Sequence, residues 1–316
     1  MTAHRPGGRR VASAAVSTRA VAVGEGRSLC VDDVGDPVGA PVLYLHGTPD
    51  SRLSRHPDDG RAAALGVRLL ALDRPGYGGS DRLPAGVRGR WPHVLAADVA
   101  TVLDELGVER CGVLAWSGGA LPGVVLAALG AARVAALTVV AGLVPRQAYA
   151  DPAVAAAGAS RLDTLELADV LPAGTLGEAI APLLAPYPCD RVLAAEHQAE
   201  QRDAANAAEV ASVPGAAEAL ADGLVEAVRH GLGGVEADVE AQAAPLDVDL
   251  EAVRCPVRLV YGSEDAVTPP AFGRWYAAHL PGARLDLVEG AAHYVALAAW
   301  DDLLAGLAAH AGGPPR

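Results

Sequence analysis

The stretch CGVLAWSGGA, residues 111–120, combines a short apolar run with a serine set among small residues. The run from Val113 to Trp116 predicts a buried strand, and the glycines after Ser117 suit the start of a helix. A sharp turn from strand to helix holds such a serine in a strained conformation and exposes its hydroxyl at the sheet edge. The motif for this turn is G-x-S-x-G, and Ala115 stands in place of its first glycine. One added methyl group is the smallest possible departure, so we expect the turn to be retained.

Two later loops carry the partners that a serine nucleophile needs. The segment GSEDAVTP, residues 262–269, contains Asp265, and the segment RLDLVEGAAHY, residues 284–294, contains His293. A histidine can take the proton of the serine, and a carboxylate holds the imidazole ring in one tautomer. The three residue types and their order along the chain therefore predict a catalytic triad, with Ser117 as the nucleophile.

Two upstream apolar runs also end in loops rich in glycine and proline, PVLYLHGTP at residues 41–49 and LLALDRPGYGGSD at residues 69–81. Ligands bind where such loops gather at the carboxyl ends of parallel strands. With the HG-x-P, D-x-x-G-x-G-x-S and G-x-x-D-x-x-x-P loops, the chain resembles the α/β-hydrolase superfamily over residues 25–310, and in particular its lidded serine-hydrolase branch. The resemblance implies an α/β fold, with a mostly parallel sheet covered by helices on both faces and an inserted helical lid.

The pattern of strand-like and helical segments divides the chain into a tail, a core and an inserted helical segment. Residues 1–24 are rich in arginine and predict a disordered tail, whereas residues 25–145 and 250–312 predict the α/β-hydrolase core. Between them, residues 146–249 contain helical segments and no strand-like run. Because the chain must return to the same sheet, we expect this segment to be a lid over the serine rather than an independent helical domain. A short linker in place of the lid is then expected to leave the serine reactive.

The resemblance also assigns roles within the loops. It selects Asp265 as the acid of the triad, although Glu264 is the neighbouring alternative. The backbone N–H of Gly118 is one expected donor of the oxyanion hole, and by resemblance the N–H of Thr48 is the other. We expect His46 to tie neighbouring loops together, and we expect the loop motif at residues 73–80 to shape the strand end without taking part in chemistry.

The composition of the chain limits the classes of molecule that it is expected to bind. The chain has 316 residues and a formal net charge of −13, which repels nucleic acid and anionic membranes. No signal peptide and no apolar segment of membrane-spanning length is recognisable, so we expect a cytoplasmic protein. Cys30, Cys111, Cys189 and Cys255 are far apart in sequence and predict free thiols rather than a metal site.

These features together predict an enzyme that needs no cofactor or metal and acts on a small-molecule substrate. We expect it to cleave a small ester, lactone or related acyl compound through an acyl-enzyme on Ser117. Members of the superfamily with an aspartate nucleophile open epoxides or remove halogens, and the serine argues against both reactions. Members with the same three residues also include proline iminopeptidases, carbon–carbon hydrolases and lyases. A non-catalytic ligand-binding protein on the same scaffold is the alternative from another class.

Overall fold

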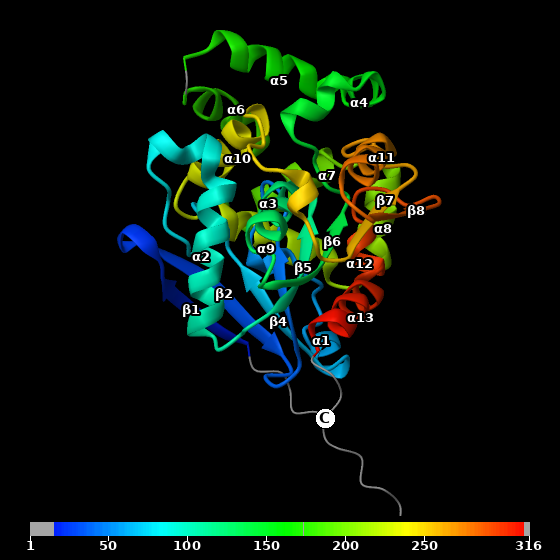
Figure 1. Ribbon diagram of the computed structural model, residues 1–316. Coiled ribbons are helices and arrows are strands. Elements are labelled where there is room, and N and C mark those ends of the chain that lie inside the picture. Colours follow the sequence, from blue (N-terminus) through cyan, green and yellow to red (C-terminus); the bar gives the residue numbers. More distant parts are fainter. Residues whose placement is uncertain (1–15, 173, 313–316) are drawn as a thin grey trace, which may run out of the picture.

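Eight strands of the described chain form one sheet with the order β1-β2-β4-β3-β5-β6-β7-β8 (Figure 1). The computed structural model describes residues 16–172 and 174–312. The strands are β1 (Ser17–Ala22), β2 (Ser28–Gly35), β3 (Ala40–Leu45), β4 (Val67–Leu72), β5 (Cys111–Trp116), β6 (Val134–Val140), β7 (Val257–Gly262) and β8 (Arg284–Val288). β2 pairs antiparallel with β1 and β4, and all other pairs are parallel. This mixed, mostly parallel sheet confirms the predicted fold class.

The central strands are mostly apolar because both faces of the sheet are covered. All side chains of β5 and β6 are buried. On one face, helices α2 (Trp91–Glu105), α3 (Ala120–Leu129) and α11 (Pro270–His279) contribute to a large hydrophobic core. On the other face, a second core includes residues of α1 (Gly60–Ala64), α12 (Val295–Ala298) and α13 (Trp300–Ala311). The two cores fix the sheet, and the strand ends can therefore hold loops in defined positions.

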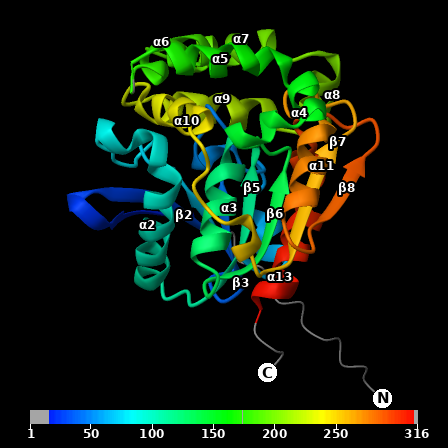
Figure 2. The same cartoon turned by 45° about the horizontal axis from the view of Figure 1, so that its top comes forward.

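The chain between β6 and β7 is helical throughout its described regular structure. Its α-helices are α4 (Pro152–Ala157), α5 (Ala159–Val170), α6 (Leu176–Leu184), α7 (Arg191–Glu200), α8 (Ala204–Ser212), α9 (Ala216–Ala227) and α10 (Gly233–Ala243). Figure 2 shows α5, α6 and α7 as an outer layer, with α9 and α10 between that layer and the sheet. The insertion is the helical lid that the fold class predicts, while its domain limits at residues 146 and 249 stay a prediction.

The N-terminal prediction needs a correction. Residues 1–15 lie outside the described residues, but Ser17–Ala22 is strand β1 and not part of a disordered tail. Only Val21 of this strand is buried, so the segment carries almost no hydrophobic pattern that could predict a strand. Its order comes instead from antiparallel pairing with β2 at the edge of the sheet.

The four cysteines all lie within the described residues, and no disulfide joins them there. Cys30, Cys111 and Cys255 are buried and unpaired, as the sequence predicts, whereas Cys189 is partly exposed and also unpaired. Across residues 16–172 and 174–312, no helix has the length and apolar character needed to cross a membrane.

Candidate active site

Ser117 lies at the turn between β5 and α3, where the first residues after the strand form a short 3₁₀ helix, η4 (Ser117–Gly119). Its φ of 53° is in the left-handed region, which strains a residue that has a Cβ atom by about 1–3 kcal/mol. A Cβ atom on Gly118 would lie 2.1 Å from Thr48 Oγ1, and one on Gly119 would lie 2.3 Å from the carbonyl oxygen of Leu45. The turn therefore requires glycine at both positions, and this strand-turn-helix geometry is that of a nucleophile elbow.

The alanine at the first position of the motif is accommodated by a glycine on the following helix. A Cβ atom built on Gly123 of α3 would lie 2.8 Å from the Cβ atom of Ala115. The methyl group of Ala115 thus occupies space that Gly123 leaves open, and Ala115 itself is fully buried. The departure from G-x-S-x-G therefore leaves the contact between β5 and α3 intact.

The three residues predicted as a triad lie together in one line of hydrogen-bond contacts. His293 Nε2 lies 3.1 Å from Ser117 Oγ, and His293 Nδ1 lies 3.0 Å from Asp265 Oδ2. Ser117, Asp265 and His293 are all buried. Because these residues come from the ends of β5, β7 and β8, the sheet brings together positions that are far apart in the sequence.

The loop after β7 holds Asp265 as a hydrogen-bond acceptor. The N–H groups of Val267 and Thr268 donate to Asp265 Oδ1, and the Thr268 hydroxyl donates to Oδ2 at 2.7 Å. Burial alone would raise the pKa of Asp265, but the hydrogen bond and charge of His293 and the hydrogen bonds from Thr268 outweigh it and lower that pKa. The carboxylate is therefore ionised where histidines titrate. Glu264, the neighbouring alternative, is exposed.

The segment after β3, residues 46–50, lies directly beside Ser117 and is called the Thr48 loop below. A Cβ atom on Gly47 would lie 3.2 Å from Ser117 Cβ, and one on Gly118 would lie 3.3 Å from Thr48 N. The two backbone segments expected to form the oxyanion hole are thus in contact with each other and with the serine. Any side chain at position 47 would crowd the nucleophile.

Buried polar contacts fix the Thr48 loop. Its first residue, His46, is fully buried, with Nε2 accepting from the N–H of Arg74 and Nδ1 donating to the carbonyl oxygen of Gly47. Burial, with the charge of Arg74, holds the pKa of His46 well below its usual value, so the ring is neutral. The Thr48 hydroxyl donates to Asp238 of lid helix α10, which also forms a buried ion pair with Arg74. His46 thus ties loops together, as the sequence predicts, and the contact with Asp238 was not foreseen.

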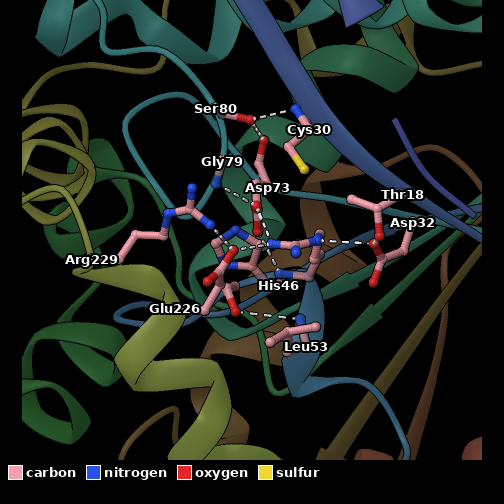
Figure 3. A network of polar contacts seen from close by, with 12 residues as sticks. Thr18, Cys30, Asp32, His46, Leu53, Asp73, Gly79, Ser80, Glu226 and Arg229 are labelled. Carbon is pink, nitrogen blue, oxygen red and sulfur yellow. Dashed lines mark hydrogen bonds and ion pairs between the residues drawn. The ribbon is translucent and has the colours of Figure 1, made fainter. Parts of the chain in front are cut away.

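The loop after β4 is held by a second buried network, drawn in Figure 3. Asp73 accepts hydrogen bonds from the N–H groups of Arg52 and Gly79, and its own carbonyl oxygen accepts from the Ser80 hydroxyl. The Arg52 guanidinium bridges Asp73 to Glu226 of lid helix α9. These contacts agree with the expectation that this motif shapes the loop, and they add a tie between the core and the lid.

A cavity of about 340 Å³ opens onto Ser117 between the core loops and the lid. Its wall includes the apolar residues Leu143, Leu183, Leu184, Leu224 and Val267 and the polar residues Asp50, His197, Gln198, Gln201, Asn206 and Gln242. Most of these side chains belong to the lid. The lid therefore lies at the same edge of the sheet as the serine, and it supplies both apolar surface and hydrogen-bonding groups.

Asp50 is an unforeseen carboxyl group in this cavity. Oδ1 accepts a hydrogen bond from the N–H of Ser51 at 2.9 Å, and a Cβ atom on Gly223 of lid helix α9 would lie 2.4 Å from it. Burial raises the pKa of Asp50 to about 8, although hydrogen bonds from Ser51 and Ser54 act in the opposite direction. At neutral pH the raised pKa favours the protonated form of this carboxyl group, which lines the cavity.

The raised pKa predicts a specific dependence of stability on pH. The folded protein holds the Asp50 proton up to about pH 8, whereas the unfolded chain releases it near the ordinary value of 3.8. The contribution of Asp50 to stability is therefore present at low pH and lost as the pH rises through this window. Asp50→Asn keeps the shape and stays neutral, so we expect its free energy of unfolding, relative to wild type, to rise between pH 5 and pH 8. Urea unfolding at several pH values measures this difference, and parallel curves would contradict it.

Comparisons with known proteins agree with this fold. The family model described as alpha/beta hydrolase fold matches residues 40–175. Rhodomycin D methylesterase DnrP of Streptomyces peucetius is 28% identical over 291 residues, which cover 90% of this chain and 94% of that relative. Epoxide hydrolase A of Mycobacterium tuberculosis is 41% identical over 86 residues, but the match covers only 27% of this chain and 26% of that relative. The crystal structure of an esterase from Rhodococcus sp. ECU1013 superposes with a TM-score of 0.60 at 21% identity, covering 95% of this chain and 100% of that one.

The sheet order, the nucleophile elbow and the aligned serine, histidine and aspartate define an esterase-like α/β hydrolase. The chain has the α/β-hydrolase fold, and its helical cap region lies between β6 and β7.

Proposed function

We propose that this protein is a serine hydrolase that cleaves small carboxylic esters, lactones or related acyl compounds. The observation that carries the proposal is the continuous line of contacts from Asp265 through His293 to Ser117 at a nucleophile elbow. The roles of these residues, and of the Thr48 and Gly118 amides as the oxyanion hole, are part of the proposal.

The geometry supports an ordinary acyl-transfer sequence. Ser117 Oγ attacks the carbonyl carbon while His293 Nε2 takes its proton, and the carbonyl oxygen becomes an oxyanion that the Thr48 and Gly118 N–H groups stabilise. His293 then gives the proton to the leaving alcohol, and an acyl-enzyme remains on Ser117. Water attacks this ester with His293 again as the base, which releases the carboxylic acid and restores the serine.

The serine also separates ester hydrolysis from epoxide opening. A carboxylate nucleophile that opens an epoxide forms an ester, and water can then cleave that ester. A serine hydroxyl attacking the same epoxide would form an ether, which the site has no means to cleave. Although Epoxide hydrolase A is among the similar proteins, Ser117 therefore favours acyl substrates.

The cavity supports a small substrate with both apolar and polar parts. A volume of about 340 Å³ is at the lower end of the range for small-molecule pockets. The leucine side chains suit an apolar acyl or alcohol group, and the amide side chains of Gln198, Gln201 and Gln242 suit a substrate that also carries hydrogen-bonding groups. The free cysteines support the proposed cytoplasmic location, since thiols persist in a reducing compartment.

A substrate panel tests the proposal. We expect hydrolysis of p-nitrophenyl and methyl esters of short acids, with a burst of alcohol release when hydrolysis of the acyl-enzyme is slow. We expect no turnover of styrene oxide or other simple epoxides under the same conditions. Diol formation from epoxides without ester hydrolysis would contradict the proposal.

A further inference from the structure

Three consecutive N–H groups of the loop that carries His293 donate to side chains of lid helix α8. The N–H of Ala292 donates to Glu209 Oε1 at 2.8 Å, and the N–H of Tyr294 donates to Glu209 Oε2 at 2.8 Å. Between them, the N–H of His293 itself donates to Asn206 Oδ1 at 2.9 Å. These three N–H groups of the histidine loop are therefore held by side chains of the lid.

The two acceptors lie on one face of α8 because residues three apart in a helix are neighbours. Asn206 is 3% exposed, and Glu209 is partly buried. Asp203 caps the start of the helix by accepting from the N–H of Asn206 at 2.8 Å. On the same side, Val210 belongs to the hydrophobic core that also contains Val295 of α12. Apolar packing and capping thus fix the helix that presents the acceptors.

The opposite side of the His293 backbone is held by the nucleophile strand. Trp116, the residue before Ser117, donates from its indole Nε1 to the carbonyl oxygen of His293 at 3.2 Å. The N–H of His293 thus contacts the lid, and its carbonyl contacts β5. The imidazole ring is also held on two sides, because Nδ1 contacts Asp265 and Nε2 contacts Ser117. The position of Nε2 relative to Ser117 Oγ therefore depends on the lid as well as on the core.

We infer that Glu209, together with Asn206, is a positioning residue of the lid that holds His293 in the orientation needed to accept the Ser117 proton. The inference rests on the proposed role of His293 as the base. Loss of the Glu209 carboxylate would leave the N–H groups on both sides of His293 without their acceptor, and the loop could then move by fractions of an ångström. Proton transfer is sensitive to such displacements, whereas the cavity wall would change little because Glu209 does not line it.

This positioning role of Glu209 changes the expected effect of removing the lid. The sequence alone suggests that a linker in place of residues 146–249 leaves the serine reactive. Because α8 accepts from three N–H groups of the histidine loop, we now expect such a deletion to slow the chemistry itself as well as to alter selectivity. The lid is then a part of the catalytic scaffold.

Inactivation by a fluorophosphonate tests the inference without a known substrate. Ser117 Oγ forms a bond to phosphorus, the phosphorus–fluorine bond breaks, fluoride leaves, and the serine proton passes to His293. The limiting rate constant of inactivation reports on this step, and the half-saturating concentration reports on binding in the cavity. For Glu209→Ala we expect the limiting rate constant to fall at least about tenfold with the half-saturating concentration unchanged, in keeping with losses from misplaced catalytic groups.

Two variants complete the experiment. Glu209→Gln keeps one acceptor oxygen, so we expect a smaller loss of rate than in Glu209→Ala, and this variant serves if the alanine variant does not fold. Glu200→Ala removes an exposed glutamate of lid helix α7 and should leave both constants unchanged. An unchanged limiting rate in folded Glu209→Gln and Glu209→Ala, or a change confined to the half-saturating concentration, would overturn the inference. Labelling that persists in Ser117→Ala would instead overturn the proposed function.

Discussion

Replacing Ser117 by alanine is expected to abolish ester turnover and leave the fold intact. The substitution removes only the hydroxyl that we propose attacks the carbonyl, and the glycines that form the elbow remain. Loss of the nucleophile lowers kcat by about 10⁶-fold in a serine protease with the same kind of triad. Alanine also tolerates the φ of 53° no worse than serine does, so no additional strain is introduced.

The test of Ser117→Ala requires a measurement of folding and a control variant at another serine. Thermal unfolding of Ser117→Ala should match that of wild type within a few degrees. Ser17→Ala, which removes an exposed hydroxyl on the edge strand β1, should keep full activity. Ester turnover at the wild-type rate in Ser117→Ala would exclude the serine-hydrolase mechanism.

Replacing Asp265 by asparagine is expected to give the second largest loss, on the order of 10⁴-fold in kcat, as for the corresponding change in a serine protease. The NH₂ group of an asparagine can donate to His293 Nδ1, which would place the proton of the neutral ring on Nε2. Nε2 could then no longer accept the proton of Ser117. The burial of Asp265 and its contact with His293 at 3.0 Å make this effect strong. Steady-state kinetics with an ester from the panel measures it.

Glu264→Gln provides the control for this prediction. Glu264 is adjacent to Asp265 in sequence but is exposed, so loss of its charge should change kcat less than about twofold. If Glu264→Gln were the more damaging substitution, the acid of the triad would have been assigned to the wrong residue.

The sequence predicts the core and the triad because both depend on local patterns. The apolar run before Ser117 and the glycines after it are enough to predict the elbow. The loops around Asp265 and His293 are found from short motifs and from their order along the chain. Parallel strands bring their carboxyl ends to one edge, so the fold itself implies that the three residues meet.

The contacts between the lid and the catalytic loops could not be predicted in this way. Glu209 and the N–H groups it accepts from are separated by 83 and 85 positions, and no motif marks either side. The contact between Thr48 and Asp238 spans 190 positions. The raised pKa of Asp50 follows from its burial, and the close contact with Gly223 of α9 exists only in the packed structure. Strand β1 was missed because its order comes from pairing and not from burial.

The most direct test of the central claim is to find which atom becomes covalently modified. After reaction with a fluorophosphonate, intact mass spectrometry should show one adduct per chain, and peptide mapping should place it on Ser117. Ser117→Ala should not be labelled, and His293→Ala should be labelled far more slowly. An adduct on another residue, or a folded wild-type protein that remains unlabelled at saturating probe, would contradict the assignment of Ser117 as an activated nucleophile.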